Sequence, residues 1–174
     1  MSVAVTYTSR EEIQVHKFSW AVSVGIPLLA IFIQVFFPLR LRFLLVFDLP
    51  LLVTIFFAVA RRRPVPGLLT GAMIGTLQDA FPLSYIGLNG IAKTIIGYLA
   101  SSLGSRVDVE NPGSRFLMTF AFYLLHRLIY LVIEIALVGV REPWNSVHTL
   151  VAAIANGLLA VVLFAGLDRL KLRS

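Results

Sequence analysis

Apolar residues fill six long stretches of this chain, and short polar segments separate them. Each stretch is about 17 to 25 residues long, and an α-helix needs about 20 apolar residues to cross the hydrocarbon core of a bilayer. The pattern therefore predicts an all-α polytopic membrane protein, a bundle of six transmembrane helices. The predicted helices cover residues 18–37, 43–60, 65–81, 86–105, 116–140 and 147–167.

The segments between these stretches carry prolines and charges, which end helices. The run Arg61–Arg63 and Pro64 separate the second stretch from the third, while Asp48 and Pro50 interrupt the second near its start. Because no loop is longer than about ten residues, nothing outside the bilayer is expected to fold independently. We expect a cytoplasmic N-terminal segment (1–17), one transmembrane domain (18–167) and a basic cytoplasmic tail (168–174).

Composition supports the membrane class. Apolar residues make up 58% of the chain and charged residues only 14%, whereas a soluble domain is about half apolar and about a quarter charged. The absence of cysteine excludes disulfides, thiolate metal ligands and cysteine nucleophiles. The net charge of +6 comes from basic residues clustered between the apolar stretches. This distribution is typical of lipid headgroup contacts and insertion signals, so no nucleic-acid binding is expected.

The basic residues also predict the orientation. Six crossings place both termini on one side of the membrane. Of the 15 lysines and arginines, ten lie on that side, three on the other, and two (Lys93 and Arg127) within predicted helices. The positive-inside rule therefore predicts that both termini are cytoplasmic.

Small residues line one face of the third predicted helix. Gly67, Gly71, Gly75 and Asp79 follow one another at intervals of four residues, which places them on the same helix face. The next predicted helix carries Gly90 and Gly97. Such faces allow close approach of helix backbones in lipid. We interpret these five glycines as a helix-packing or partner seam, and the sequence leaves open whether it lies within the chain or against another subunit.

Several polar side chains lie within the predicted helices and are candidate buried polar or ion-pair residues. Each ionisable group there costs about 2.5–3.5 kcal/mol, so it is expected to face protein and find a partner. The stem of Lys93 can reach toward Asp79, which predicts an ion pair between them. Asn156 is expected to satisfy Arg127 or His126. The candidates are Asp48, Asp79, Lys93, Arg127, Glu134 and Asn156.

Catalytic patterns are missing from the sequence. There is no nucleophile elbow and no phosphate-binding loop, and the three histidines are scattered over different regions. We therefore expect no catalytic residues, no cofactor and no metal, and a protein that works by binding.

Several short motifs resemble one known family. The run Gly71-Ala72-Met73-Ile74-Gly75-Thr76-Leu77-Gln78-Asp79, then Ile86-Gly87-Leu88 and Gly97-Tyr98-Leu99, resembles the rod shape-determining protein MreD. Gln34, Pro50 and Asn156-Gly157 also fit this pattern. The resemblance is best over residues 47–105 and weaker over 150–173.

The resemblance implies a function. MreD proteins are non-enzymatic subunits of the bacterial elongation machinery for peptidoglycan synthesis, in the inner membrane. The implied partners are MreC and, through it, MreB, RodA and a class B penicillin-binding transpeptidase. Gly71, Gly75 and Asp79 match the family pattern, and Gly87 joins the predicted seam on the same ground.

A second function stays open. The MreD family is similar in fold to the substrate-binding membrane subunits of energy-coupling-factor vitamin transporters. Such a subunit would need a ligand cavity near the outer face, and Asp48, Lys93, Glu134 and Trp144 lie at a suitable depth. The first predicted helix, however, offers few of the small residues that would dock a coupling subunit. The sequence therefore favours MreD.

Overall fold

The computed structural model of the chain describes residues 18–81, 87–104, 107, 109, 111–139 and 145–170. Every regular element in these residues is a helix, which confirms the all-α prediction. Two short 3-10 helices, Phe37–Leu39 and Arg42–Val46, lie between the first two α-helices. The α-helices are α1 (Trp20–Phe36), α2 (Leu49–Arg61), α3 (Pro64–Ala80), α4 (Leu88–Gly104), α5 (Pro112–Val138) and α6 (Ser146–Asp168).

Local sequence accounts for most helix ends. Ser19, Asn111 and Asn145 are N-caps whose side-chain oxygens accept hydrogen bonds from backbone N–H groups in the first turns of α1, α5 and α6. Prolines stand in the first turns of α2, α3 and α5, where no N–H donor is lost from the helix ladder. Gly139 ends α5 at φ +72°, the left-handed conformation that favours glycine.

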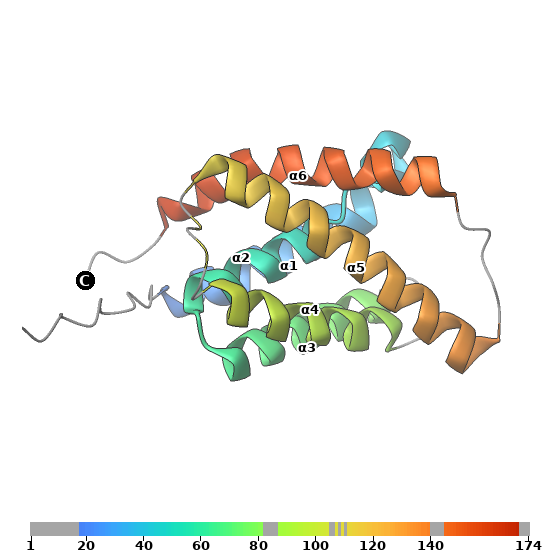
Figure 1. The fold of residues 1–174 in the computed structure, drawn as a ribbon, viewed down its shortest axis with the longest axis horizontal. Coiled ribbons are helices and arrows are strands. Elements are labelled where there is room, and N and C mark those ends of the chain that lie inside the picture. Colours follow the sequence, from blue (N-terminus) through green and yellow to red (C-terminus); the bar gives the residue numbers. More distant parts are fainter. Residues whose placement is uncertain are drawn as a thin grey trace, which may run out of the picture.

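The helices lie roughly along one axis (Figure 1). α3 and α4 form the most extensive helix pair, and α5 packs against α6. α2 contacts all five other α-helices, and every residue from Pro50 to Ala60 is buried. The start of α1 and the end of α6 lie at the same end of the bundle (Figure 1). α2 is therefore the central element around which the others are arranged.

Three of the described helical segments are long and apolar enough to cross a membrane: Trp20–Leu39, Pro112–Val138 and Ser146–Asp168. α2 has only 13 residues, a length of about 20 Å against a hydrocarbon core of about 30 Å. The predicted second span over residues 43–60 is thus not one helix, because it breaks at Phe47 and Asp48. Asp48 caps the new helix, and Pro50 follows in its first turn.

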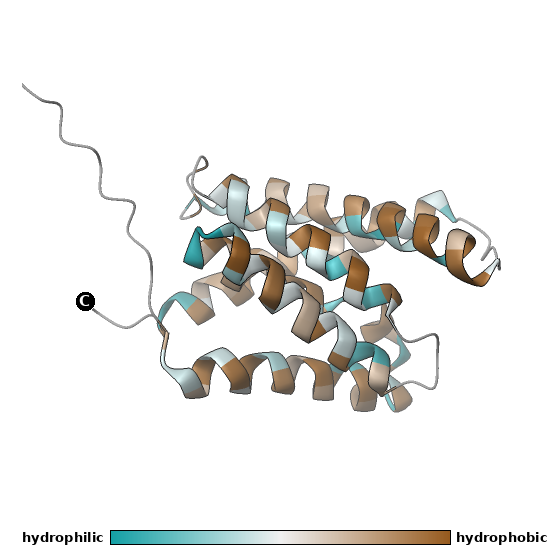
Figure 2. Ribbon diagram, turned by 90° about the horizontal axis from the view of Figure 1, so that it is seen from below, coloured by the Kyte–Doolittle hydropathy of each residue, from teal (hydrophilic) through white to brown (hydrophobic). Residues whose placement is uncertain are grey.

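Large apolar side chains cover the outside of the bundle. Exposed leucine, isoleucine, valine and phenylalanine residues occur on every α-helix except α2. Figure 2 shows hydrophobic residues along the length of the helices, with short hydrophilic stretches among them. A soluble protein rarely exposes a continuous apolar surface of this kind. The exterior is therefore suited to a lipid environment.

Glycines bring α3 and α4 into backbone contact. A Cβ atom added at Gly67, Gly71 or Gly75 would lie less than 3.0 Å from a backbone oxygen of α4. A Cβ at Gly97 would meet the backbone oxygen of Gly67. These glycine faces are therefore turned toward each other within the chain, leaving no room for a partner's helix between them.

Two predicted seam residues behave differently from the others. Gly90 faces the side chain of Thr76 rather than backbone, so its contact is softer. Gly87 has no atom within 4 Å of an added Cβ, and its φ is +105°. Its place in the packing seam is thus wrong: Gly87 serves the turn before α4, where L-residues are strained.

Candidate functional site

α2 begins inside the bundle, and its first N–H groups are all accounted for. The Asp48 carboxylate accepts a hydrogen bond from Leu51 N (2.9 Å), and Gln34 Oε1 of α1 accepts one from Leu49 N (3.1 Å). Pro50 has no N–H, and Leu52 N donates to the Asp48 carbonyl (3.0 Å). The first N–H groups of any helix have no acceptor within that helix. Because Asp48 and Gln34 supply acceptors for them, the start of α2 can lie inside the bundle.

Asn156 of α6 satisfies the backbone on the other side of the break. Its Oδ1 accepts from Asp48 N (2.9 Å), and its Nδ2 donates to the carbonyls of Val46 and Ala152 (2.8 Å each). The expectation that Asn156 partners Arg127 or His126 is therefore wrong. Non-helical backbone at membrane depth is tolerated only where protein supplies its hydrogen bonds, and the side chain of Asn156 performs this role.

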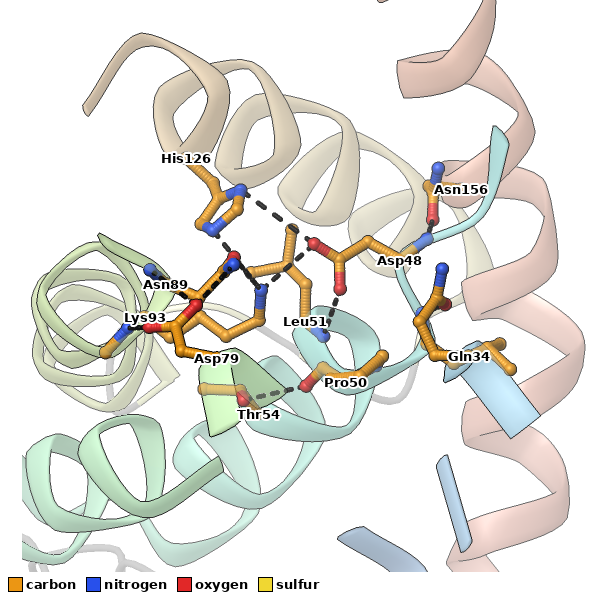
Figure 3. Close-up of polar contacts among 12 residues, drawn as sticks. Gln34, Asp48, Pro50, Leu51, Thr54, Asp79, Asn89, Lys93, His126 and Asn156 are labelled. Atoms are coloured by element: carbon orange, nitrogen blue, oxygen red, sulfur yellow. Dashed lines mark hydrogen bonds and ion pairs between the residues drawn. The ribbon is translucent and has the colours of Figure 1, made fainter. Parts of the chain in front are cut away.

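Lys93 of α4 is fully buried, at 0% exposure, and has three polar neighbours. Its Nζ lies 3.0 Å from Asp48 Oδ2, 3.1 Å from Asn89 Oδ1 and 3.3 Å from His126 Nε2. Figure 3 shows Lys93, Asp48 and His126 converging between α2, α4 and α5. An ammonium group has three N–H donors, so every donor of this lysine finds an acceptor.

The ion pair predicted between Asp79 and Lys93 is wrong. The Asp79 carboxylate, on a residue only 2% exposed, instead accepts from the backbone N–H groups of Gly87 and Gly90 (3.0 Å each) and from Asn89 Nδ2 (2.8 Å). It thus caps the N-terminus of α4, where the helix dipole favours a negative charge. Because the Asp79 carboxylate already accepts these hydrogen bonds, Lys93 is left to pair with Asp48.

Asn89 joins these two arrangements, and sequence reasoning missed it. Its Nδ2 donates to Asp79 while its Oδ1 accepts from Lys93. The available signal was its position on α4, one turn before Lys93 and on the same helix face. We call the connected set the polar network; it comprises Gln34, Asp48, Asp79, Asn89, Lys93, His126 and Asn156 (Figure 3).

Two candidate residues lie outside the polar network. Glu134 is buried near the end of α5, and no hydrogen bond or ion pair joins it to another described residue. Arg127 is half-buried on the same helix and forms no ion pair within the described part of the chain. Of the candidate buried residues, Asp48 and Lys93 therefore pair with each other, and Glu134 does not join them.

A polar pocket of about 230 Å³ lies beside the network. Four helices, α1, α3, α4 and α5, contribute residues to its wall. The segment that precedes α2 contributes the rest. The lining residues are Gln34, Leu45, Val46, Phe47, Asp48, Gln78, Asn89, Tyr123, His126, Arg127 and Tyr130. Among the described residues there is no group of three or more histidine, aspartate or glutamate side chains that could hold a metal ion.

Other polar contacts fasten helices together away from the network. Arg115, at the start of α5, is buried, pairs with Asp168 at the end of α6 and donates to the Val109 carbonyl (2.7 Å). Arg61 of α2 donates to Ser23 of α1 (3.0 Å) and Thr70 of α3 (3.1 Å). Arg61 and Arg115 each connect elements that are distant in the chain.

These features define a helical membrane protein with an apolar exterior and an interior whose polar groups are mainly paired with one another. The family model of the rod shape-determining protein MreD matches residues 14–170. The chain therefore belongs to the MreD family, as its motifs predicted, and is a rod shape-determining membrane protein. Neither the curated proteins nor the solved structures compared with it contain a match.

Proposed function

We propose that this chain is a non-enzymatic subunit of the bacterial cell-elongation complex for peptidoglycan synthesis. It binds MreC in the cytoplasmic membrane and, through MreC, associates with MreB, RodA and a class B penicillin-binding transpeptidase. The family match over residues 14–170 carries this proposal and favours it over a vitamin transporter subunit. The polar network adds support. Its side chains bond one another and so fix the relative positions of the helices, and no two of its members are arranged as a nucleophile and its base.

The proposal includes six membrane crossings with both termini in the cytoplasm. Two observations support it: the bias of basic residues between the two sides, and the position of the α1 start and the α6 end at one end of the bundle (Figure 1). α2 is too short to cross alone, and the 3-10 helix Arg42–Val46 precedes it in the chain.

Cysteine labelling tests this topology, because the chain contains no natural cysteine. Leu41 and Arg169 are exposed residues on opposite predicted sides. In intact cells, a membrane-impermeant maleimide should label Leu41→Cys and should label Arg169→Cys only after the membrane is opened. Labelling of both in intact cells would contradict the six-crossing arrangement.

The docking surface for MreC is proposed on the outer face of the α3–α4 hairpin. The glycine faces are occupied within the hairpin, so a partner's helix would contact the apolar side chains on its outside. On α3 these include Val65, Leu69 and Met73, all well exposed. They follow at intervals of four residues and so form one stripe along the helix.

Co-purification tests the partner and the surface together. A tagged chain is purified in mild detergent from the bacterium that encodes it, and bound proteins are identified by mass spectrometry. MreC should be recovered, and Leu69→Trp or Met73→Trp should lower its recovery and disturb rod shape. Val162→Trp, at an exposed position on α6, is the matched control. Recovery of an ATPase module and a vitamin in place of MreC would refute the proposal.

A further inference from the structure

The polar pocket beside the network has the composition of a ligand site. Eight of its eleven lining residues carry a hydrogen-bonding side chain, although it lies within a bundle whose outer surface is apolar. Its volume of about 230 Å³ is below the roughly 300–1,000 Å³ that encloses a drug-sized ligand. The pocket therefore suits a single polar group, with the remainder of a larger molecule left outside.

The charges around the pocket leave one cation uncompensated. Asp48 lines the pocket, but its carboxylate is paired with Lys93 at 3.0 Å. Arg127 also lines the pocket and has no ion-pair partner among the described residues. A cation in the membrane interior is costly without a partner. The pocket thus has an excess of positive charge at Arg127.

His126 also lines the pocket, and one of its ring nitrogens is buried without a hydrogen-bond partner. As an ammonium group Lys93 can only donate, so His126 Nε2 accepts at 3.3 Å and the ring proton is assigned to Nδ1. His126 is 3% exposed, and its Nδ1 has no hydrogen-bond partner. Asp48 Oδ2, at 3.9 Å, is too distant to accept directly. This nitrogen is enclosed beside Asp48 and has no surface in the pocket, so among the described lining residues Arg127 supplies the cationic donors that a ligand can reach.

We propose that the pocket binds one anionic group, a phosphate or a carboxylate, at Arg127. The planar guanidinium of Arg127 binds such groups through two parallel N–H donors. Gln34 uses its Oε1 for Leu49 N, so its amide N–H groups remain to contact the ligand. The anion comes either from the headgroup of a membrane lipid or from a soluble small molecule.

Binding by the purified full-length chain tests the proposal and distinguishes the two sources. The probes are palmitoyl-oleoyl phosphatidylglycerol, uncharged dioleoylglycerol and inorganic phosphate. Native mass spectrometry measures lipid retention, and circular dichroism measures the unfolding temperature. Arg127→Gln removes the proposed ligand contact. Arg42→Gln removes an exposed arginine from the 3-10 helix before α2 and is the matched control.

A lipid site predicts retention of one phosphatidylglycerol per chain by the wild type and by Arg42→Gln. Retention by Arg127→Gln should be about tenfold lower, corresponding to one charge-assisted hydrogen-bond contact. A soluble-anion site predicts instead that phosphate raises the unfolding temperature of the wild type and of Arg42→Gln but not of Arg127→Gln. If Arg127→Gln does not fold, Arg127→Lys carries the test, because it keeps the charge and loses the two-donor geometry.

Three results would each overturn the proposal. The first is that neither phosphatidylglycerol nor phosphate binds the folded wild type. The second is that Arg42→Gln loses as much binding as the Arg127 variants. The third is that dioleoylglycerol is retained as well as phosphatidylglycerol. All three are independent of MreC recovery, so they do not bear on the proposed function.

Discussion

The replacement Asn156→Leu tests the central claim that polar side chains support a helix start inside the bundle. Asn156 is fully buried, and its amide bonds both Asp48 N and the Val46 carbonyl. Hydropathy alone predicts that leucine is the better residue in a transmembrane helix. The structure predicts the opposite sign, because the substitution leaves a buried donor and a buried acceptor without partners.

The magnitude follows from the bonds that are lost. Hydrogen bonds between helices in membranes average about 0.6 kcal/mol and reach about 1.7 kcal/mol. Loss of two such bonds should therefore lower the free energy of unfolding by about 1–3 kcal/mol. The third bond, to Ala152 within α6, is local and is not counted.

Unfolding in mixed micelles of a mild detergent and sodium dodecyl sulfate, followed by circular dichroism, measures this change. Leu158→Ala is the control, since Leu158 is exposed on the same helix and substitutions at such positions usually change stability by less than about 0.5 kcal/mol. If Asn156→Leu unfolds at the same detergent fraction as the wild type, or at a higher one, the reasoning about the start of α2 is refuted.

Three further predictions use the same unfolding measurement. Lys93→Met should lower the free energy of unfolding by up to about 3–5 kcal/mol, because it leaves the partly buried Asp48 carboxylate without its ion-pair partner. Adding Asp48→Asn should recover part of that loss, and strict additivity of the two changes would argue against the pair. Gly71→Ala should cost about 1–3 kcal/mol because its Cβ would meet the Lys93 backbone. Gly25→Ala is the control; an added Cβ there has no atom within 4 Å, so the change should be neutral or slightly stabilising. Equal effects of the two substitutions would mean that α3 and α4 are not in backbone contact. Asp79→Asn should cost about 1.5–3 kcal/mol by weakening the cap of α4, and wild-type stability would show that the charge of Asp79 is not required.

The polar partners depended on tertiary structure. Asp48, Asp79 and Lys93 were recognisable as buried charges, but depth along the membrane does not give the rotation of each helix about its axis. That rotation makes Asp48, 45 residues away, the partner of Lys93. Asp79 instead caps the N-terminus of α4, a contact for which it must lie beside the first turn of that helix.

The sequence by itself determined the helical class, the approximate position of five of the six helices and membership of the MreD family, because hydropathy and glycine spacing act over one or two helical turns. Tertiary structure decided that residues 43–60 are not one helix. A helix can begin at Leu49, inside the bundle, only because Gln34 and Asn156 supply hydrogen bonds from two other helices. The residues of the segment 43–60 do not reveal those partners. Without them, the N–H and C=O groups at the break would have no hydrogen bonds in a place that water does not reach.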